Sequence, residues 1–451
     1  MIAVVGMDGS ALGPQAEAAL AAATLVVGAR RHLAAVPVLT APGRARTIVL
    51  GELAPALDAL AAHDGDAVLL ASGDPGFFGI VRVLRERGLA VTVLPGVSSV
   101  AMAFARAGLP WDDAVVVSAH GRDPRPAVNV CRACSKVAVL TGPGCSPAEI
   151  GAALAGWDRL LIVCEHLGTE RERLTECSPA GAAEHAWEDP NVVLVLSTAP
   201  PSRNRHPSWM WDRCPSRGTN VTFMPQWAEG WALPEEQFDS RDAVLTKAEV
   251  RALALARLGP GPGALVWDVG AGSGSVGIEC ARFGAAVIAV ERDELRCERV
   301  RANATRHGVD VRIVPGEAPQ ALAELPDPDA VFVGGGGPNV IEAVAARRPA
   351  RIVVALAAVE RAGPATAALA AAGYATDGAL VQASRFTPLP GDVHRLAAAN
   401  PVFLVWGTAA PGTTEPVGSA GPQLHGAGAT EPVSAGDHGG PGIPGTGPGA
   451  P

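Results

Sequence analysis

The stretch Val266-Trp-Asp-Val-Gly270-Ala-Gly272-Ser-Gly274-Ser-Val-Gly277 determines how the second half of the 451-residue chain folds. The apolar run Leu265–Val269 predicts a buried strand, and the glycine-rich turn after it opens a helix. Glycines at such a turn permit positive φ and let a ligand approach the backbone closely. Glu291 ends the next predicted strand, where its carboxylate can accept hydrogen bonds from both hydroxyls of a ribose. These features predict an α/β domain that binds a nucleoside-containing ligand.

Two classes of ligand fit this turn. From Gly272 to Gly277 the sequence matches G-x-G-x-x-G, the fingerprint of dinucleotide-binding folds. Read from Asp268 it is D-x-G-x-G-x-G, which is typical of S-adenosylmethionine (SAM)-dependent methyltransferases. The acid before the first glycine favours SAM over NAD, and so does the predicted helix Lys247–Leu258 ahead of the strand. An NAD(P)-dependent oxidoreductase and a glycine turn without a ligand remain the alternatives.

The rest of this half continues the α/β pattern. Thr246-Lys-Ala-Glu249 reads as a capping box with Thr246 as the N-cap, and Gly259 is expected to end that helix. The loop Gly316–Pro319, which includes Ala318, is expected beside an adenine, and Phe332–Pro338 is expected beside the methyl donor or acceptor. The predicted strands are Leu265–Val269, Ala286–Val290, Val311–Val314, Ala330–Val333, Arg351–Ala355, Leu380–Ser384 and Val402–Trp406.

The first half also alternates short β-rich runs with Ala- and Leu-rich helical stretches, such as Phe77–Arg87 and Ser99–Ala107, which predicts further α/β layers. Several strands end in Gly, Pro, Ser or His loops, and strand carboxyl ends are where ligands gather in open sheets. These loops are Gly6–Gly9, Ala71–Gly76, Leu94–Ser99 and Ser118–Gly121. The predicted strands are Ile2–Val5, Thr24–Val27, Ala67–Ala71, Val91–Leu94, Ala114–Val117, Lys136–Leu140, Leu160–Cys164 and Val192–Leu196.

Composition narrows the function classes. The net charge of −9 argues against nucleic acid as the main partner, because phosphate binding needs a basic surface. No uninterrupted apolar run is long enough for a membrane helix, and the N-terminus reads as a strand, so a cytoplasmic location is expected. The scattered cysteines fit reduced thiols, and we predict no metal site. The tail 408–451 is rich in Gly and Pro and is predicted to be disordered.

The loops of the first half carry a family resemblance. Ala71-Ser-Gly-Asp-Pro75, Pro95-Gly-Val-Ser-Ser99 and His120-Gly121 resemble the tetrapyrrole methylases of cobalamin biosynthesis. The turn Gly270–Gly274, Glu291-Arg-Asp293 and Phe332-Val-Gly-Gly-Gly336 resemble the partner methyltransferase. The two halves in this order resemble the fused, decarboxylating precorrin-6Y methyltransferases. Gly6-Met-Asp-Gly9 departs from the G-x-G pattern usual in the first loop, and a non-catalytic SAM-binding protein is therefore a further alternative.

The resemblance implies an architecture. A two-lobed tetrapyrrole methylase domain over 1–198 would precede a linker at 199–234. A Rossmann-like class I SAM methyltransferase domain would follow over 235–407. The first domain would methylate C5 of the macrocycle, and the second would methylate C15 and decarboxylate the ring C acetate. The cofactor would be SAM in both domains, the partner a polycarboxylate tetrapyrrole, and a homo-oligomer is left open.

The resemblance also implies site residues. Weak candidates for substrate contact are His120, Lys247, Arg251 and Arg385, because arginines and lysines suit a substrate with many carboxylates. We find no nucleophile–base pair, and methyl transfer to an electron-rich carbon needs alignment and exclusion of water more than a strong base; the catalytic residues are therefore left unassigned. The implied SAM contacts are Thr246, Gly270, Ala271, Gly272, Ser273, Gly274, Glu291 and Ala318 in the second domain, with Gly73, Asp74, Ser98 and Ser99 in the first.

Overall fold

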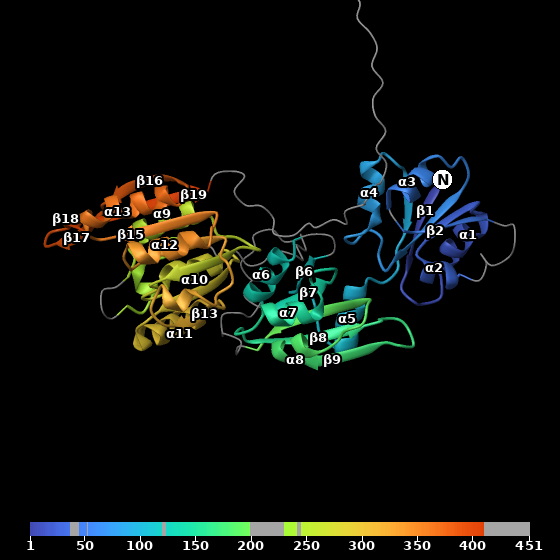
Figure 1. The fold of residues 1–451 in the computed structure, drawn as a ribbon, viewed down its shortest axis with the longest axis horizontal. Coiled ribbons are helices and arrows are strands. Elements are labelled where there is room, and N and C mark those ends of the chain that lie inside the picture. The colour runs from blue at the N-terminus through green and yellow to red at the C-terminus, as the bar shows by residue number, and fades with distance from the viewer. Residues whose placement is uncertain (37–44, 52, 120–122, 199–229, 241–244, 410–451) are drawn as a thin grey trace, which may run out of the picture. The chain divides into compact units, whose positions relative to one another are not determined.

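The computed structural model describes the chain except for residues 37–44, 52, 120–122, 199–229, 241–244 and 410–451. His120, most of the predicted linker and nearly all of the predicted disordered tail lie outside the described residues. The described part contains three large β-sheets, each flanked by helices (Figure 1). Two of these sheets fall in the first predicted domain and one in the second, which agrees with the predicted α/β class.

The first sheet is wholly parallel and has the strand order β3-β2-β4-β1-β5. Because all its strands run the same way, their carboxyl ends and the loops after them meet at one edge of the sheet. The strands are β1 (Ile2–Met7), β2 (Leu25–Gly28), β3 (Arg46–Val49), β4 (Ala67–Ser72) and β5 (Val91–Leu94). The helices are α1 (Pro14–Ala22), α2 (Arg30–Ala34), α3 (Leu53–Ala61) and α4 (Ile80–Glu86).

The second sheet is mixed and has the order β6-β7-β10-β8-β9, with β10 antiparallel to both of its neighbours. Helix α5 begins at the predicted Ser99, and its apolar face packs on this sheet. The strands are β6 (Val115–Ser118), β7 (Lys136–Leu140), β8 (Arg159–Glu165), β9 (Arg173–Cys177) and β10 (Asn191–Ser197). The helices are α5 (Ser99–Ala107), α6 (Arg125–Ala133), α7 (Pro147–Ala153) and α8 (Pro179–Glu184).

The third sheet has seven strands in the order β13-β12-β11-β14-β15-β19-β16. Strand β19 runs in the opposite direction to the other six strands. The strands are β11 (Leu265–Val269), β12 (Ala286–Glu291), β13 (Arg312–Pro315), β14 (Ala330–Val333), β15 (Arg351–Leu356), β16 (Tyr374–Val381) and β19 (Val402–Ala409). The helices are α9 (Ala248–Leu258), α10 (Ser275–Arg282), α11 (Glu294–His307), α12 (Pro338–Ala346) and α13 (Ala362–Ala371).

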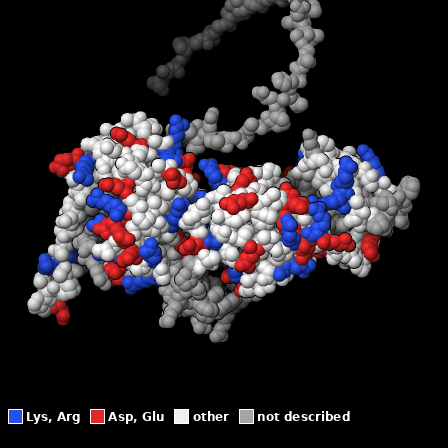
Figure 2. All heavy atoms as spheres, turned by 60° about the horizontal axis from the view of Figure 1, so that its bottom comes forward, with Lys and Arg blue, Asp and Glu red and all other residues white. Residues whose placement is uncertain are grey.

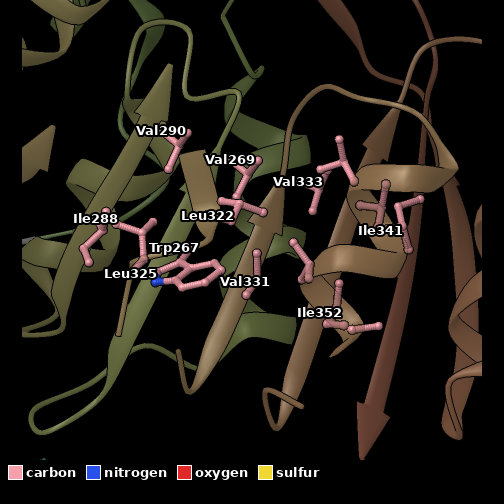
Figure 3. Close-up of a cluster of buried hydrophobic side chains, with 14 of the residues drawn as sticks. Trp267, Val269, Ile288, Val290, Leu322, Leu325, Val331, Val333, Ile341 and Ile352 are labelled. Atoms are coloured by element: carbon pink, nitrogen blue, oxygen red, sulfur yellow. The ribbon is translucent and has the colours of Figure 1, made fainter. Parts of the chain in front are cut away.

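Both faces of the third sheet are buried, which explains why its central strands read as continuous apolar runs. One face packs against α12 and α13 around Trp267, Val331 and Ile352 (Figure 3). The other face packs against α9 and α10 around Val266, Val287 and Phe332. The successive residues Val266 and Trp267 therefore pack on opposite faces of the sheet. A shift of one residue would exchange the two faces, so this packing fixes the register of β11.

Two sequence predictions are wrong in detail. The capping box does not form: Lys247 is the N-cap of α9 and makes no side-chain cap. Instead the Ala248 amide donates to Glu235 Oε1 at 3.1 Å, and the Glu249 carboxylate bonds to Arg385. The predicted strand Leu380–Ser384 is the junction between β16 and β17 (Ser384–Leu389), which forms an exposed hairpin with β18 (Val393–Ala398).

The surface bears both signs of charge. On the face drawn in Figure 2, acidic and basic side chains of the described residues are interspersed. Among the helices that the structure describes, none combines the length and apolar character needed to cross a bilayer.

Candidate cofactor and substrate sites

The glycine turn of the second domain lies where the strand order reverses direction. From β11 the chain proceeds to β12 and β13 on one side, and then to β14 and β15 on the other. Ligands of open α/β sheets bind at the carboxyl ends of the strands beside such a switch point. The loops that follow β11 and β14 meet there, because a Cβ on Gly270 would lie 3.1 Å from the Gly335 nitrogen. The sheet thus brings the predicted glycine loops together at the carboxyl edge of its strands.

Glycine is required at several positions of the turn for backbone reasons. Gly270, Gly272 and Gly274 have φ values of 72°, 60° and 75°, in the left-handed region that side chains disfavour. A Cβ on Gly277 would lie 2.9 Å from Asp268 Oδ2, so helix α10 can approach β11 only with glycine there. The exposed Gly270 and the half-buried Ala271 present the turn to solvent, whereas Ser273 is buried.

Glu291 is held rigidly at the end of β12. Its side chain is buried, and Oε2 accepts from the Gly272 amide at 2.8 Å while Oε1 accepts from the Asp293 amide at 3.1 Å. Each carboxylate oxygen has a second lone pair, so these bonds orient the group without exhausting its capacity as an acceptor. A fixed acidic acceptor beside a positive-φ glycine turn fits the ribose of a nucleoside cofactor.

Asp268 is a second buried acid beneath the turn. Its Oδ2 accepts from the Gly277 amide at 2.8 Å, and Oδ1 has no hydrogen-bond partner among the described residues. Burial, together with the nearby charge of Glu291, raises the pKa of Asp268 to about 7 despite the Gly277 bond. Unpartnered buried acceptors are rare in folded proteins. Asp268 therefore has one unused hydrogen-bonding oxygen, Oδ1, directly below the glycine turn.

The segment before α9 is held by a buried ion pair. Arg251 Nε bonds to Glu279, and both side chains are essentially inaccessible. The other Arg251 donors reach the carbonyl oxygens of Thr246 and Leu233, and Glu279 also accepts from the Ala232 and Leu233 amides. These contacts place Thr246 and leave Arg251 a positioning role, out of reach of a substrate carboxylate.

The remaining predicted residues of this domain fall at different places. Lys247 is exposed, and Ala318 is half-buried in the loop after β13. Arg385 stands at the base of the exposed hairpin and bonds to Glu235 and Glu249, which hold the pKa of Arg385 above its usual value. Its charge is thus already neutralised by two carboxylates, and its geometry gives no support to a substrate contact.

The loops of the first domain meet as tightly as those of the second. A Cβ on Gly6 would lie 2.1 Å from the Gly73 oxygen and 2.2 Å from the Gly96 nitrogen. The Gly73 amide donates to Met7 at 2.7 Å, and Gly73 itself has a φ of 58°. The loops after β1, β4 and β5 are therefore joined through their glycines at the carboxyl edge of the first sheet.

Polar side chains stabilise these loops locally. Ser98 caps α5 by accepting from the Ala101 amide at 3.1 Å, and Ser99 is the first residue of that helix. Asp74 accepts from the Gly76 amide at 2.8 Å in its own turn. The side chains of Ser98 and Asp74 thus stabilise their own loops, in addition to the cofactor contact predicted for them.

Asp8 links two of the loops, and the sequence had not singled it out. Its Oδ2 accepts from the Val97 amide at 2.8 Å, and its Oδ1 accepts from the Ser10 amide at 2.9 Å. Burial alone would raise its pKa, but the hydrogen bonds from Ser10 and Val97 hold the pKa of Asp8 below its ordinary value. An open cavity of about 580 Å³ adjoins it, lined among others by Ser10, Met102, Arg106, Thr169 and Glu172.

Sequence reasoning also missed supporting residues in the second domain. Asn303 on α11 donates to the Ser273 oxygen at 2.9 Å, and its Oδ1 accepts from the Asp239 amide at 2.9 Å. Like Glu279, it is a buried polar residue inside a helix. The only local signal is a polar side chain at a position of the helix that should be apolar, and the partner lies far away in sequence.

Two family models match different parts of the chain. The family model described as tetrapyrrole (corrin/porphyrin) methylases matches residues 3–183, and the one described as precorrin methyltransferase domain matches residues 236–408.

Relatives match across both domains. A precorrin-6Y C(5,15)-methyltransferase [decarboxylating] of Sinorhizobium sp is 34% identical over 354 residues, covering 74% of this chain and 77% of that protein. A protein of the same name from Mycobacterium tuberculosis (strain CDC 1551 / Oshkosh) is 33% identical, covering 78% and 85%. A cobalt-precorrin-7 C(5)-methyltransferase of Salmonella typhimurium is 33% identical over 44% of this chain and 98% of its own length. With its two matched domains in this order, the chain belongs to the family of the decarboxylating precorrin-6Y C(5,15)-methyltransferases.

Proposed function

We propose that the chain uses SAM to methylate precorrin-6Y at C5 and C15, and that it decarboxylates the ring C acetate. The C5 reaction is assigned to residues 1–198, and the C15 reaction with decarboxylation to residues 235–407. The observation that carries the proposal is the meeting of the Gly270 turn, Glu291 and the Gly334–Gly337 loop at the switch point of the third sheet. Family membership supplies the substrate class.

The strand order favours a SAM-dependent methyltransferase over an NAD(P)-dependent oxidoreductase. The antiparallel β19 lies between β15 and β16, whereas the dinucleotide-binding order 3-2-1-4-5-6 has no such strand. The SAM reading of the Asp268–Gly274 motif accords with that arrangement. Free thiols at all the described cysteines also suit an enzyme that works in the cytoplasm.

In the second domain the residues around the turn bind and orient. Glu291 would accept from the ribose of SAM and the loop with Ala318 would lie beside the adenine, while Asp268 anchors the turn from beneath. When bound, SAM supplies an electrophilic sulfonium methyl group. The exposed glycines Gly334, Gly335 and Gly336 allow the acceptor carbon to approach without a side chain in between. Alignment of this kind, with water excluded, is what methyl transfer to an electron-rich carbon requires.

In the first domain the joined glycine loops play the corresponding part. Gly73 and Ser98 would contact the cofactor, and Asp8 fixes the distance between the β1 and β5 loops. The cavity beside Asp8 offers room for part of a bulky macrocycle.

Calorimetric titration of SAM into the intact chain and a Glu291→Ala variant tests the proposal. The parent is expected to show two binding events, and the variant one, because only the second domain loses its ribose acceptor. Glu298→Ala is the matched control, since Glu298 is exposed on α11 and belongs to none of the loops at the switch point, and two events should remain.

A single event that vanishes in Glu291→Ala would leave the first domain without a cofactor and refute the double methylation. Binding of NAD in place of SAM would overturn the whole assignment.

A further inference from the structure

A cationic cluster lies on the first sheet outside the residues discussed so far. Arg31 and His32 lie on α2, directly after β2, and Ser72 is the last residue of β4. Because Gly28 pairs with Leu70 in register, the residues that follow each strand emerge side by side. The cluster therefore stands at the same carboxyl edge as the Gly6, Gly73 and Gly96 loops.

The side chains of the cluster fix one another. Arg31 Nη2 donates to Ser72 Oγ at 2.9 Å, and Arg31 Nε donates to His32 Nε2 at 3.3 Å. Ser72 Oγ also lies 3.2 Å from His32 Nε2. Since Nε2 accepts from Arg31, the imidazole is neutral; burial and the Arg31 charge both lower the pKa of His32. The three groups thus present one positive charge, which belongs to the exposed Arg31.

That charge has no carboxylate partner within the described residues, where Arg31 forms no ion pair. Other arginines of this domain behave differently: Arg106 pairs with Glu172, and Arg87 pairs with Asp58. A guanidinium held in place by a hydroxyl and an imidazole is preorganised to receive a carboxylate with two hydrogen bonds. Holding it without a local acid preserves its full charge for a ligand.

The position suits the edge of a macrocycle. Strand β2 is the neighbour of β4, and β4 is the neighbour of β1. Neighbouring strands are about 4.8 Å apart, so the cluster lies about 5 to 10 Å along the edge from the β1 loop. A tetrapyrrole bound over that loop has its acetate and propionate groups on its rim, at this kind of distance from its reacting carbon.

We propose that Arg31, held by Ser72 and His32, binds a peripheral carboxylate of the tetrapyrrole in the first domain and so positions the macrocycle for C5 methylation. Ser72 and His32 are positioning residues that act through Arg31. The inference rests on the proposed function, because that function supplies a substrate with carboxylates.

The test compares the intact chain with Arg31→Gln, Arg31→Lys and Arg30→Gln. Arg30 is the matched control: it precedes Arg31 on the same helix, is exposed, and makes no hydrogen bond or ion pair with any described residue. The KM and kcat of the C5 step are measured with precorrin-6Y. In parallel, binding of the carboxylate-rich porphyrin uroporphyrin is followed by fluorescence titration, which needs no turnover.

Arg31→Gln is expected to raise KM for the C5 step and Kd for uroporphyrin by about 10- to 100-fold, the range of a lost charged hydrogen-bonded contact. Its kcat and calorimetric SAM binding should stay near the parent values. Arg31→Lys should recover part of the loss, and Arg30→Gln should match the parent. A Gln variant with the affinity of the parent, or equal losses in both Gln variants, would overturn the proposal.

Failure of the proposed function gives a different result. A parent that binds uroporphyrin in an Arg31-dependent way but transfers no methyl group would refute the C5 activity and keep the carboxylate site. A parent that binds no porphyrin at all would overturn the carboxylate site.

Discussion

The buried pair between Arg251 and Glu279 predicts a large and localised loss of stability. Replacing Glu279 by Gln keeps the shape of the side chain and removes its charge. Arg251 would then be a cation with no accessible surface and no counter-charge, left with uncharged acceptors alone: the Thr246 and Leu233 carbonyls and the new side-chain amide oxygen. Loss of one partner of a buried pair costs about 3 to 5 kcal/mol, since the remaining charge stays desolvated.

This loss should be confined to the second domain, so hydrogen exchange read peptide by peptide is the appropriate assay. Amides of β11 and β12 exchange through opening of that domain, and 3 to 5 kcal/mol corresponds to exchange about 100- to several thousand-fold faster. Peptides of the first sheet should be unchanged. Glu317→Gln, which breaks the exposed pair with Arg292, is the control and should change the β11 amides by about 1 kcal/mol or less.

The paired replacement Arg251→Met with Glu279→Leu should restore much of the stability, because no unpaired charge remains. Exchange in Glu279→Gln within about tenfold of the parent would refute the view that this pair holds the segment before α9.

Two further predictions concern the turn. Between about pH 4 and pH 7, Asp268 retains in the folded state a proton that the unfolded chain releases. The stability that Asp268 contributes therefore falls as the pH rises from about 4 to about 7, and it is constant above that. The rise of its pKa from 3.8 to about 7 on folding corresponds to about 4 kcal/mol. In Asp268→Asn this part of the pH dependence should vanish, and denaturation of both proteins at pH 5 and pH 8 checks it: an equal change in parent and variant would contradict the buried proton. Gly270→Ala adds the left-handed penalty of about 1 to 2 kcal/mol and a Cβ 3.1 Å from the Gly335 nitrogen, so SAM affinity of the second domain should drop by about tenfold or more in calorimetry. Gly261→Ala, where a Cβ meets nothing within 4 Å, should bind as the parent does, and equal affinities in the two variants would argue against a cofactor at this turn.

The central strands could be predicted from the sequence because the apolar pattern that marks them lies within each strand itself. Strand β11 and strand β14 are covered on both faces and therefore read as unbroken apolar runs. Strands β3, β9 and β18 were missed because they are exposed or only half-buried and carry charged and polar residues at alternating or irregular positions. Their pairing is determined by the neighbouring strand, which a pattern along one segment does not report.

Candidate site residues can be predicted from the sequence where the backbone conformation dictates the residue type. The turn needs glycine because its backbone has positive φ, and Glu291 is an acid at the end of an apolar strand. Both features are visible in the sequence. Arg251, Arg385 and the failed capping box at Thr246 depend instead on partners far along the chain, namely Glu279, Glu235 and Glu249. From sequence alone a charged residue is predicted to be exposed, because the counter-charge that allows it to be buried is brought close only by the fold.

The division of labour between the domains is tested most directly by the mass of the product made from precorrin-6Y and SAM with a deuterated methyl group. The parent should add two labelled methyl groups and lose one carbon dioxide. In Gly6→Val the new Cβ would lie 2.1 Å from the Gly73 oxygen and disrupt the first-domain loops, whereas the second domain keeps its own core. Its product should carry one labelled methyl group and still lack the carboxylate, and Gly13→Ala, a substitution into open space, should behave as the parent. A Gly6→Val product with two labelled methyl groups, or one that retains the ring C carboxylate, would contradict one methyl transfer per domain.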